Sequence, residues 1–103
     1  MTCLAYTIPN MNLEYQISIP VTVLQEGKRF VAYSPALDIS TAGKTTKEAK
    51  KRFGELVQIF FEEVHEMGTT DAVLKNLGWV KFKREWQPPR LVSQQTNRIK
   101  IPA

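Results

Sequence analysis

A chain of 103 residues, 43% of them hydrophobic, is long enough for one domain with a single core and too short for two. The formal net charge of +4 is unevenly spread: residues 1–45, 46–78 and 79–103 carry net charges of 0, −1 and +5, which indicates an anionic partner for the last part or a solvated tail. The apolar residues stand in short periodic segments and the start of the chain lacks the pattern of a signal peptide, which excludes a membrane-spanning helix and favours a cytoplasmic protein.

The first predicted strand follows a stretch without any period. Residues 1–12 mix small, polar and proline residues, and we expect an irregular leader there. Over residues 13–23 the odd positions are apolar and the even positions are mostly polar, which predicts a strand with one buried face. Pro20 cannot donate to a sheet ladder, so this strand either lies at an edge or bends there and pairs differently on each side.

Two further strands complete a predicted meander. The turn Glu26-Gly27-Lys28 precedes residues 29–34, which form the second strand of an antiparallel hairpin and are ended by Pro35. After a turn over residues 35–38, the short β-branched segment 39–42 can return as a third strand.

A long amphipathic helix is predicted next. Thr45 and Glu48 have the spacing of a capping box, and Gly68 is a suitable stop. Apolar residues at steps of three and four cover about a quarter of the helix circumference and predict packing on one face of the sheet. These are Ala49, Phe53, Leu56, Val57, Phe60, Val64 and Met67. Ile59 and Phe61 flank this stripe, and we expect one to contact the next helix and the other a second subunit.

The C-terminal part is predicted to hold one short helix and one strand. A helix of about two turns begins at Thr69-Thr70-Asp71 and ends at Gly78. Val80 and Phe82 then alternate with lysines, which predicts a strand or a strand-like arm with these two side chains on its buried face. Residues 88–103 form a polar basic tail, of which residues 98–101 can become a strand if a partner offers an edge.

Together these patterns predict an α+β fold. We expect an antiparallel three- to four-stranded sheet with one long helix packed on one face, in the order β-β-β-α-α-β. The domain spans residues 13–87, between the leader 1–12 and the tail 88–103.

Catalytic and metal-binding groups are sparse. The single cysteine, Cys3, excludes an intrachain disulfide and a zinc site made only of cysteines from this chain. His65 lies opposite the apolar stripe, where it and the neighbouring Glu62, Glu63 and Glu66 fit a solvated polar face better than a weak metal site. We therefore expect no enzymatic activity, no cofactor and no metal.

Two groups of side chains are candidates for binding a partner. The first crowds the start of the long helix, against the helix dipole, and fits either a solvated face or a basic patch for an acidic protein or nucleic acid. The second interleaves aromatic residues with cations, as single-stranded nucleic-acid binders do, although its alternation favours a core strand with one solvated face. The candidates are Lys47, Lys50, Lys51 and Arg52 in the first group, and Trp79, Lys81, Lys83, Arg84 and Trp86 in the second.

The junction between sheet and helix, residues 31–49, resembles the signature of the HicB family. That family comprises antitoxin-type proteins of bacterial and archaeal HicA–HicB toxin–antitoxin pairs and orphan relatives. The shared elements are Pro35, the Gly43-Lys44-Thr45 turn and Glu48-Ala49, and the resemblance covers roughly residues 21–64. Many members carry Pro-Gly where this chain has Asp38-Ile39.

The resemblance implies a partial ribonuclease H-like fold, a homo-oligomer of two or more subunits, and binding to a small HicA-like ribonuclease toxin. The strand region offers only Glu14, Glu26 and Asp38, too few carboxylates for metal-dependent ribonuclease H chemistry. About 25 residues follow Gly78, too few for a helix-turn-helix domain, so we expect an orphan or truncated member. The alternative function is a nucleic-acid-binding regulator that uses the basic helix start and the C-terminal arm.

Overall fold

The computed structural model describes residues 2–7, 16–83 and 85–103 of the chain. A four-stranded antiparallel sheet has the order β1-β2-β3-β4, and β5 and β6 form a separate hairpin. The strands are β1 (Thr2–Thr7), β2 (Gln16–Glu26), β3 (Arg29–Ser34), β4 (Ile39–Gly43), β5 (Val80–Phe82) and β6 (Glu85–Gln87). The helices are α1 (Thr46–Glu66) and α2 (Thr70–Asn76).

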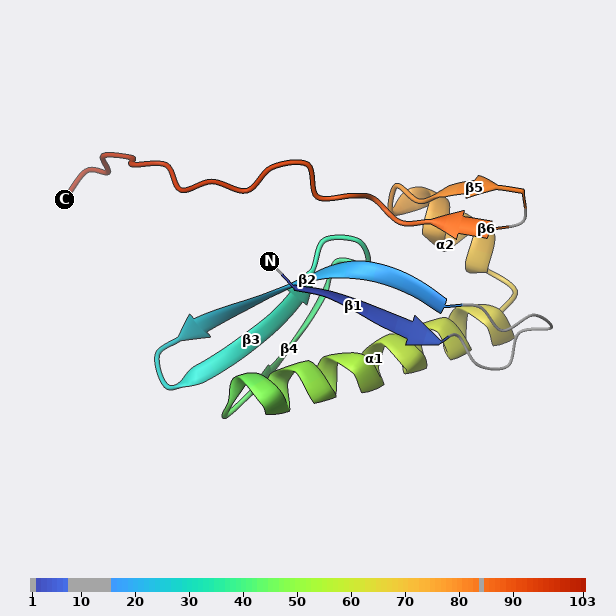
Figure 1. Cartoon of the computed structure of the whole chain (residues 1–103), viewed down its shortest axis with the longest axis horizontal. Coiled ribbons are helices and arrows are strands. Elements are labelled where there is room, and N and C mark those ends of the chain that lie inside the picture. The colour runs from blue at the N-terminus through green and yellow to red at the C-terminus, as the bar shows by residue number, and fades with distance from the viewer. Residues whose placement is uncertain (1, 8–15, 84) are drawn as a thin grey trace.

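The arrangement of these elements confirms the predicted α+β fold. The long helix α1 runs along one face of the four-stranded sheet (Figure 1). The short helix α2 and the β5–β6 hairpin lie beside the C-terminal part of α1, and residues 88–103 lead away as an extended arm that is exposed from Arg90 onward (Figure 1). The order β-β-β-α-α-β holds for the central part of the chain, with β1 added before it and β6 after it.

The prediction of an irregular leader is wrong for residues 2–7, which form β1. This strand pairs with the first half of β2, from Thr2 opposite Val21 to Thr7 opposite Gln16. The sequence of this segment has no strand period, and pairing with β2, rather than a local preference, makes it extended. The rest of the expected leader, residues 1 and 8–12, and residues 13–15 of the expected strand lie outside the described residues.

Pro20 lies where β2 changes its partner. Residues 16–21 pair with β1, whereas residues 22–26 pair with β3. The second of the two expectations for this proline is therefore confirmed. The first half of β2 pairs with β1 and not with β3. Pro20 has no N–H to donate, but β3 does not pair with this half of β2 and therefore loses no hydrogen bond.

The core lies between α1 and the face of the sheet that carries the odd residues of β2. Its members from β2, β3 and α1 are Ile17, Ile19, Val21, Ala32, Ala49, Phe53, Val57, Phe61 and Val64, all buried. The observed stripe is rotated toward Phe61 relative to the predicted one, and Met67 is exposed. The rotation follows from the C-terminal part of the chain, because the Phe61 ring packs edge to face against Trp79 with centroids 6.1 Å apart. Ile59, the other flanking residue, is 50% exposed.

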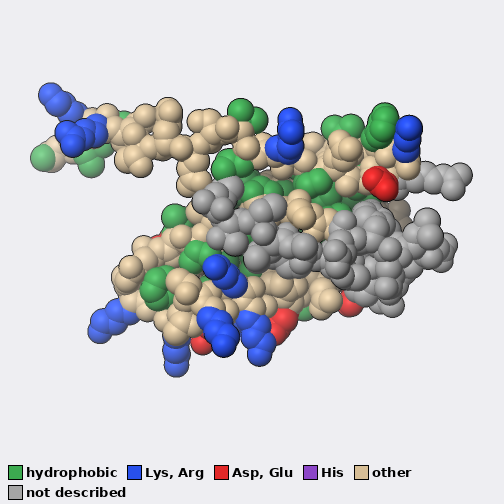
Figure 2. Space-filling view, viewed as in Figure 1, with side chains coloured by type: hydrophobic (Ala, Val, Ile, Leu, Met, Phe, Trp, Pro, Cys, Tyr) green, Lys and Arg blue, Asp and Glu red, His purple; other side chains and the backbone are tan. Residues whose placement is uncertain are grey.

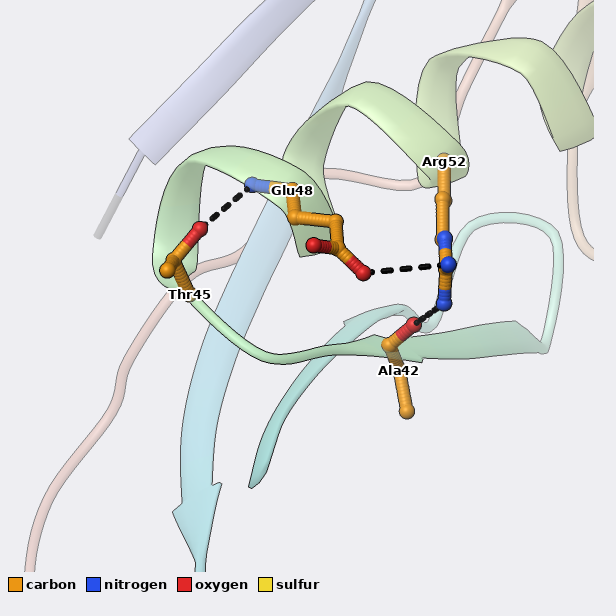
Figure 3. A network of polar contacts seen from close by, with 4 residues as sticks. All are labelled: Ala42, Thr45, Glu48 and Arg52. Carbon is orange, nitrogen blue, oxygen red and sulfur yellow. Dashed lines mark hydrogen bonds and ion pairs between the residues drawn. The ribbon is translucent and has the colours of Figure 1, made fainter. Parts of the chain in front are cut away.

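The junction between β4 and α1 is held by a cap and a clamp. Thr45 is the N-cap, and its hydroxyl accepts the backbone N–H of Glu48 at 3.0 Å. The Glu48 carboxylate does not complete the predicted capping box but pairs with Arg52 at 3.0 Å (Figure 3). Arg52 also donates to the carbonyl of Ala42 at 3.0 Å, so one guanidinium ties the end of β4 to the second turn of α1 (Figure 3).

Gly43 allows the end of β4 to approach the helix backbone. A Cβ atom at this position would lie 2.6 Å from the backbone nitrogen of Ala49 and 3.1 Å from its Cα. Both atoms belong to the first turn of α1, which cannot move without breaking the Thr45 cap. The side chain of residue 43 therefore has to be a hydrogen atom.

The turn between β3 and β4 is closed by polar contacts of its own residues. The backbone N–H of Asp38 donates to the carbonyl of Ser34 at 2.9 Å, and Asp38 adopts a left-handed conformation with φ of 53°. The buried Ser34 hydroxyl accepts the N–H of Ala36 at 3.2 Å. The Tyr33 phenol donates to the Asp38 carboxylate at 3.1 Å, and chiefly this bond raises the pKa of Tyr33 above its ordinary value of 10.0.

We predict that Gly43→Ala lowers the free energy of unfolding by about 3 kcal/mol, because the new methyl group must displace helix backbone. Gly27→Ala is the control: Gly27 also has a restrictive conformation, with φ of 61°, but nothing lies within 4 Å of an added Cβ. That variant should lose only about 1 kcal/mol, the strain of a left-handed residue. Urea denaturation of both variants measures the difference, and equal losses would contradict a steric role for Gly43.

We also predict that Asp38→Asn lowers the pKa of Tyr33 toward 10.0, since the neutral amide no longer disfavours the phenolate. Asparagine tolerates the left-handed backbone, so the turn is retained. Because the folded pKa is raised, the bond stabilises the fold fully below pH 10 and this contribution is lost as the pH rises through the folded pKa. Ultraviolet titration of the phenolate, with Tyr33→Phe as the blank, measures the shift, and Asp71→Asn should leave the curve unchanged.

Candidate partner-binding surfaces

Trp79 joins the C-terminal part of the chain to the rest of the core. Gly78, with φ of 91°, ends α2, and the next N–H, that of Trp79, returns to the carbonyl of Leu74 at 2.9 Å. This reversal turns the indole inward, where it is 3% exposed. Its Nε1–H donates to the carbonyl of Ala36 at 2.7 Å, so residues 43 positions apart are linked through a buried hydrogen bond.

The prediction that Val80 and Phe82 face the core is wrong. They are 62% and 58% exposed, whereas Trp86 is only 6% exposed. Lys81 pairs with Trp86 across the hairpin, so the face that carries Trp79, Lys81 and Trp86 turns toward the body. Alternation predicts a two-sided strand without saying which side is buried, and here two indoles offer more apolar area to the core than Val80 and Phe82 do.

The first candidate surface consists of exposed residues of the β5–β6 hairpin, with Val80 and Phe82 on its outward side and Lys81 on the side of Trp86. We call Val80, Lys81, Phe82 and Lys83 the hairpin surface. Lys83 Nζ lies 5.4 Å from the centre of the Phe82 ring, and Lys81 Nζ lies 5.5 Å from the Trp86 ring and 3.6 Å from a carboxylate oxygen of Asp71. Figure 2 shows hydrophobic side chains between cations over this hairpin, at the upper right. Arg84 lies outside the described residues.

The four cations predicted at the start of α1 do not form one free patch. Lys47 and Lys51 are exposed and four residues apart, hence on one side of the helix. Lys50 is half-buried, and the guanidinium of Arg52 is engaged by Glu48 and the Ala42 carbonyl. Arg52 therefore stabilises the β4–α1 junction.

Other cations join Lys47 and Lys51 through the strand register. Phe30 pairs with Gly43, so Arg29 and Lys44, each one residue further out, lie at the same end of the β3–β4 ladder. Figure 2 shows Lys and Arg side chains gathered at the lower left, where Figure 1 places the β2–β3 turn and the start of α1. We call this group the basic end; it consists of Lys28, Arg29, Lys44, Lys47 and Lys51, all exposed.

Sequence reasoning missed three members of the basic end, Lys28, Arg29 and Lys44. Their signal was present, because the predicted hairpin turn and the predicted strand 39–42 together place residue 29 beside residue 44. Within the described part of the chain, none of the five cations takes part in an ion pair or a side-chain hydrogen bond.

No metal centre is found in residues 2–7, 16–83 and 85–103. No group of three or more His, Cys, Asp or Glu side chains in these ranges is placed to hold a metal ion, and His65 is exposed on α1. An open hollow of about 720 Å³ lies at the root of the arm, and Arg90 is the one ionisable residue among its described lining residues. No helix in the described ranges is both long enough and apolar enough to cross a bilayer.

Comparison of the chain with protein-family models, with curated proteins and with solved structures gave no match. Function is therefore inferred from the resemblance of residues 31–49 and from the two surfaces, which lie at opposite ends of the folded body (Figure 1).

We predict that Trp79→Phe lowers the free energy of unfolding by about 3 kcal/mol, because it removes the donor to Ala36 as well as part of the buried ring. Trp86→Phe is a matched control, since the Trp86 indole is buried but donates no hydrogen bond in the described residues. The loss in the free energy of unfolding should be at least about 1 kcal/mol smaller for Trp86→Phe than for Trp79→Phe. Thermal or urea unfolding measures both, and a larger loss in the Trp86 variant would contradict the anchoring role of the indole N–H.

Proposed function

We propose that this protein is a HicB-like antitoxin-type protein, or an orphan of that family, that binds and neutralises a small HicA-like ribonuclease toxin. The support from the fold is the order of the first three predicted strands and α1, with the helix along one face of an antiparallel sheet. This is the arrangement that the resemblance of residues 31–49 implies.

The observation that carries the proposal is the exposed apolar pair on the hairpin surface. Val80 and Phe82 are more than half exposed, although a chain this short has little apolar surface to spare from its core. The hairpin beneath them is anchored by the buried Trp79 and Trp86, so the pair is presented without the entropy loss of ordering a loop. An apolar centre of this kind, with cations at its rim, suits a protein partner.

Neutralisation would follow from occlusion. A partner that buries Phe82 and Val80 gains about 2 kcal/mol from each side chain. Lys83 selects for acidic groups around its pocket, whereas Lys81 is already paired with Asp71. The exposed arm, residues 88–103, leaves the body directly after the hairpin and extends the area that one toxin molecule can contact. In this mechanism the chain covers the active surface of the toxin and supplies no reacting group.

The protein is further proposed to act as a homo-oligomer. Ile59 is the apolar residue of α1 that we place in the contact between subunits, because it is half exposed beside a stripe that is already packed on the sheet. The hairpin surface belongs to β5 and the residue after it, not to α1, and we expect it to stay available to a toxin in such an assembly.

We predict that the product of a neighbouring reading frame of toxin size inhibits growth, and that co-expression of this protein restores it. Replacement of both Val80 and Phe82 by Ser should weaken the complex at least about 30-fold, since two apolar side chains no longer enter the partner. Leu24→Ser is the control, because Leu24 is an equally large side chain, about half exposed, on β2.

Growth assays and calorimetric titration of the purified pair measure both effects. An independent gene without such a neighbour, or full rescue by the Val80 and Phe82 variant, would contradict the proposal.

A further inference from the structure

We infer that the basic end binds the phosphate backbone of a double-stranded nucleic acid. This site is separate from the hairpin surface and is not needed for toxin binding. It consists of Lys28, Arg29, Lys44, Lys47 and Lys51, contributed by the β2–β3 turn, the end of β4 and the first turns of α1.

The tertiary structure makes one surface of residues that are far apart in the chain. The register of β3 and β4 brings Arg29 beside Lys44, and Lys47 and Lys51 continue from Lys44 along one side of α1. Two acidic residues of this region form no ion pair in the described residues, Glu26 opposite Arg29 in the hairpin and Glu55 one helical turn after Lys51, so the basic end keeps a net charge of about +3.

The folded chain makes no use of these charges. Lys47 and Lys51 stand in the first two turns of α1, where the helix dipole disfavours cations. No carboxylate of the described residues forms an ion pair with any of the five, whereas Arg52, only one position from Lys51, is held by two partners. Cations in this position destabilise the helix start unless an anion binds them. Because these cations have no partner inside the fold, we expect that anion to come from another molecule.

Two features indicate which anion binds: the distance between the cations, and the lack of mostly exposed aromatic side chains near them among the described residues. Lys47 and Lys51 are about 6 Å apart along the helix axis, which spans about two phosphates of one strand at about 3.4 Å per nucleotide. Proteins that hold single strands stack the bases on exposed aromatic side chains. Among the residues whose exposure is described, the aromatic side chain that is mostly exposed is Phe82, at the other end of the body. The densely charged backbone of a duplex therefore fits better than a single strand.

The test is titration of the full-length protein into a short fluorescent DNA duplex, with an RNA duplex, a single-stranded RNA and a poly-glutamate peptide as further probes. With about four phosphates neutralised, the duplex affinity should fall by about 100-fold between 50 mM and 200 mM salt. The double variant Lys47→Gln, Lys51→Gln should lower the slope of log affinity against log salt by about 1.8. The control Lys75→Gln, Arg90→Gln has the same net charge but alters exposed cations outside the basic end, and should keep the wild-type slope.

Several results would overturn the inference: no duplex binding at the lowest salt, tighter binding to the single strand or to poly-glutamate, or equal losses in both double variants. Circular dichroism of each variant confirms that α1 is retained, as expected for exposed side chains. Replacement of Val80 and Phe82 by Ser should leave duplex binding unchanged, so failure of this site and failure of the toxin complex are distinguished. The DNA and RNA duplex arms show which of the two is preferred.

Discussion

The packing of this protein depends on how closely the end of β4 approaches the first turn of α1. Gly43 has no side chain at the point where a Cβ would lie 2.6 Å from the backbone of Ala49. Arg52 closes the same junction from the helix side by holding the carbonyl of Ala42. With both ends of the connection restrained, the apolar stripe of α1 can meet only one face of the sheet, and residues such as Phe53 and Ile19 become fully buried there.

A second link, made by Trp79, adds the C-terminal part of the chain to this core. The helix α2 has only 7 residues and would not be stable in isolation. The reversal of the backbone after Gly78 and the indole bond to Ala36 attach it to the β3–β4 turn. The same attachment decides the outward side of the hairpin, because once Trp79 and Trp86 are inside, Val80 and Phe82 must be outside. The surface we propose for protein binding is thus a direct consequence of core packing.

The two proposed surfaces use different physical chemistry. The hairpin surface offers apolar area with a cationic rim, which gives affinity through desolvation and selectivity through charge. The basic end offers charge without aromatic groups, which gives binding that is strong at low salt and insensitive to sequence. Arg52 shows why position alone does not assign a cation to a site, since it lies next to Lys51 but is used inside the fold.

Local signals in the sequence determined the hairpin of β2 and β3, the N-cap at Thr45 and the extent of α1, because turns, caps and periodicity act within a few residues. They left two interpretations of Pro20, and the pairing of β2 with β1 and β3 decided between them. Only the tertiary structure decided that residues 2–7 are a strand, since pairing with β2 makes them so. It also decided the buried side of residues 79–86, because that choice depends on the total area that two indoles bury. The predicted strands already implied that Arg29 lies next to Lys44, but only the structure shows the clamp that removes Arg52 from the free charges of the basic end.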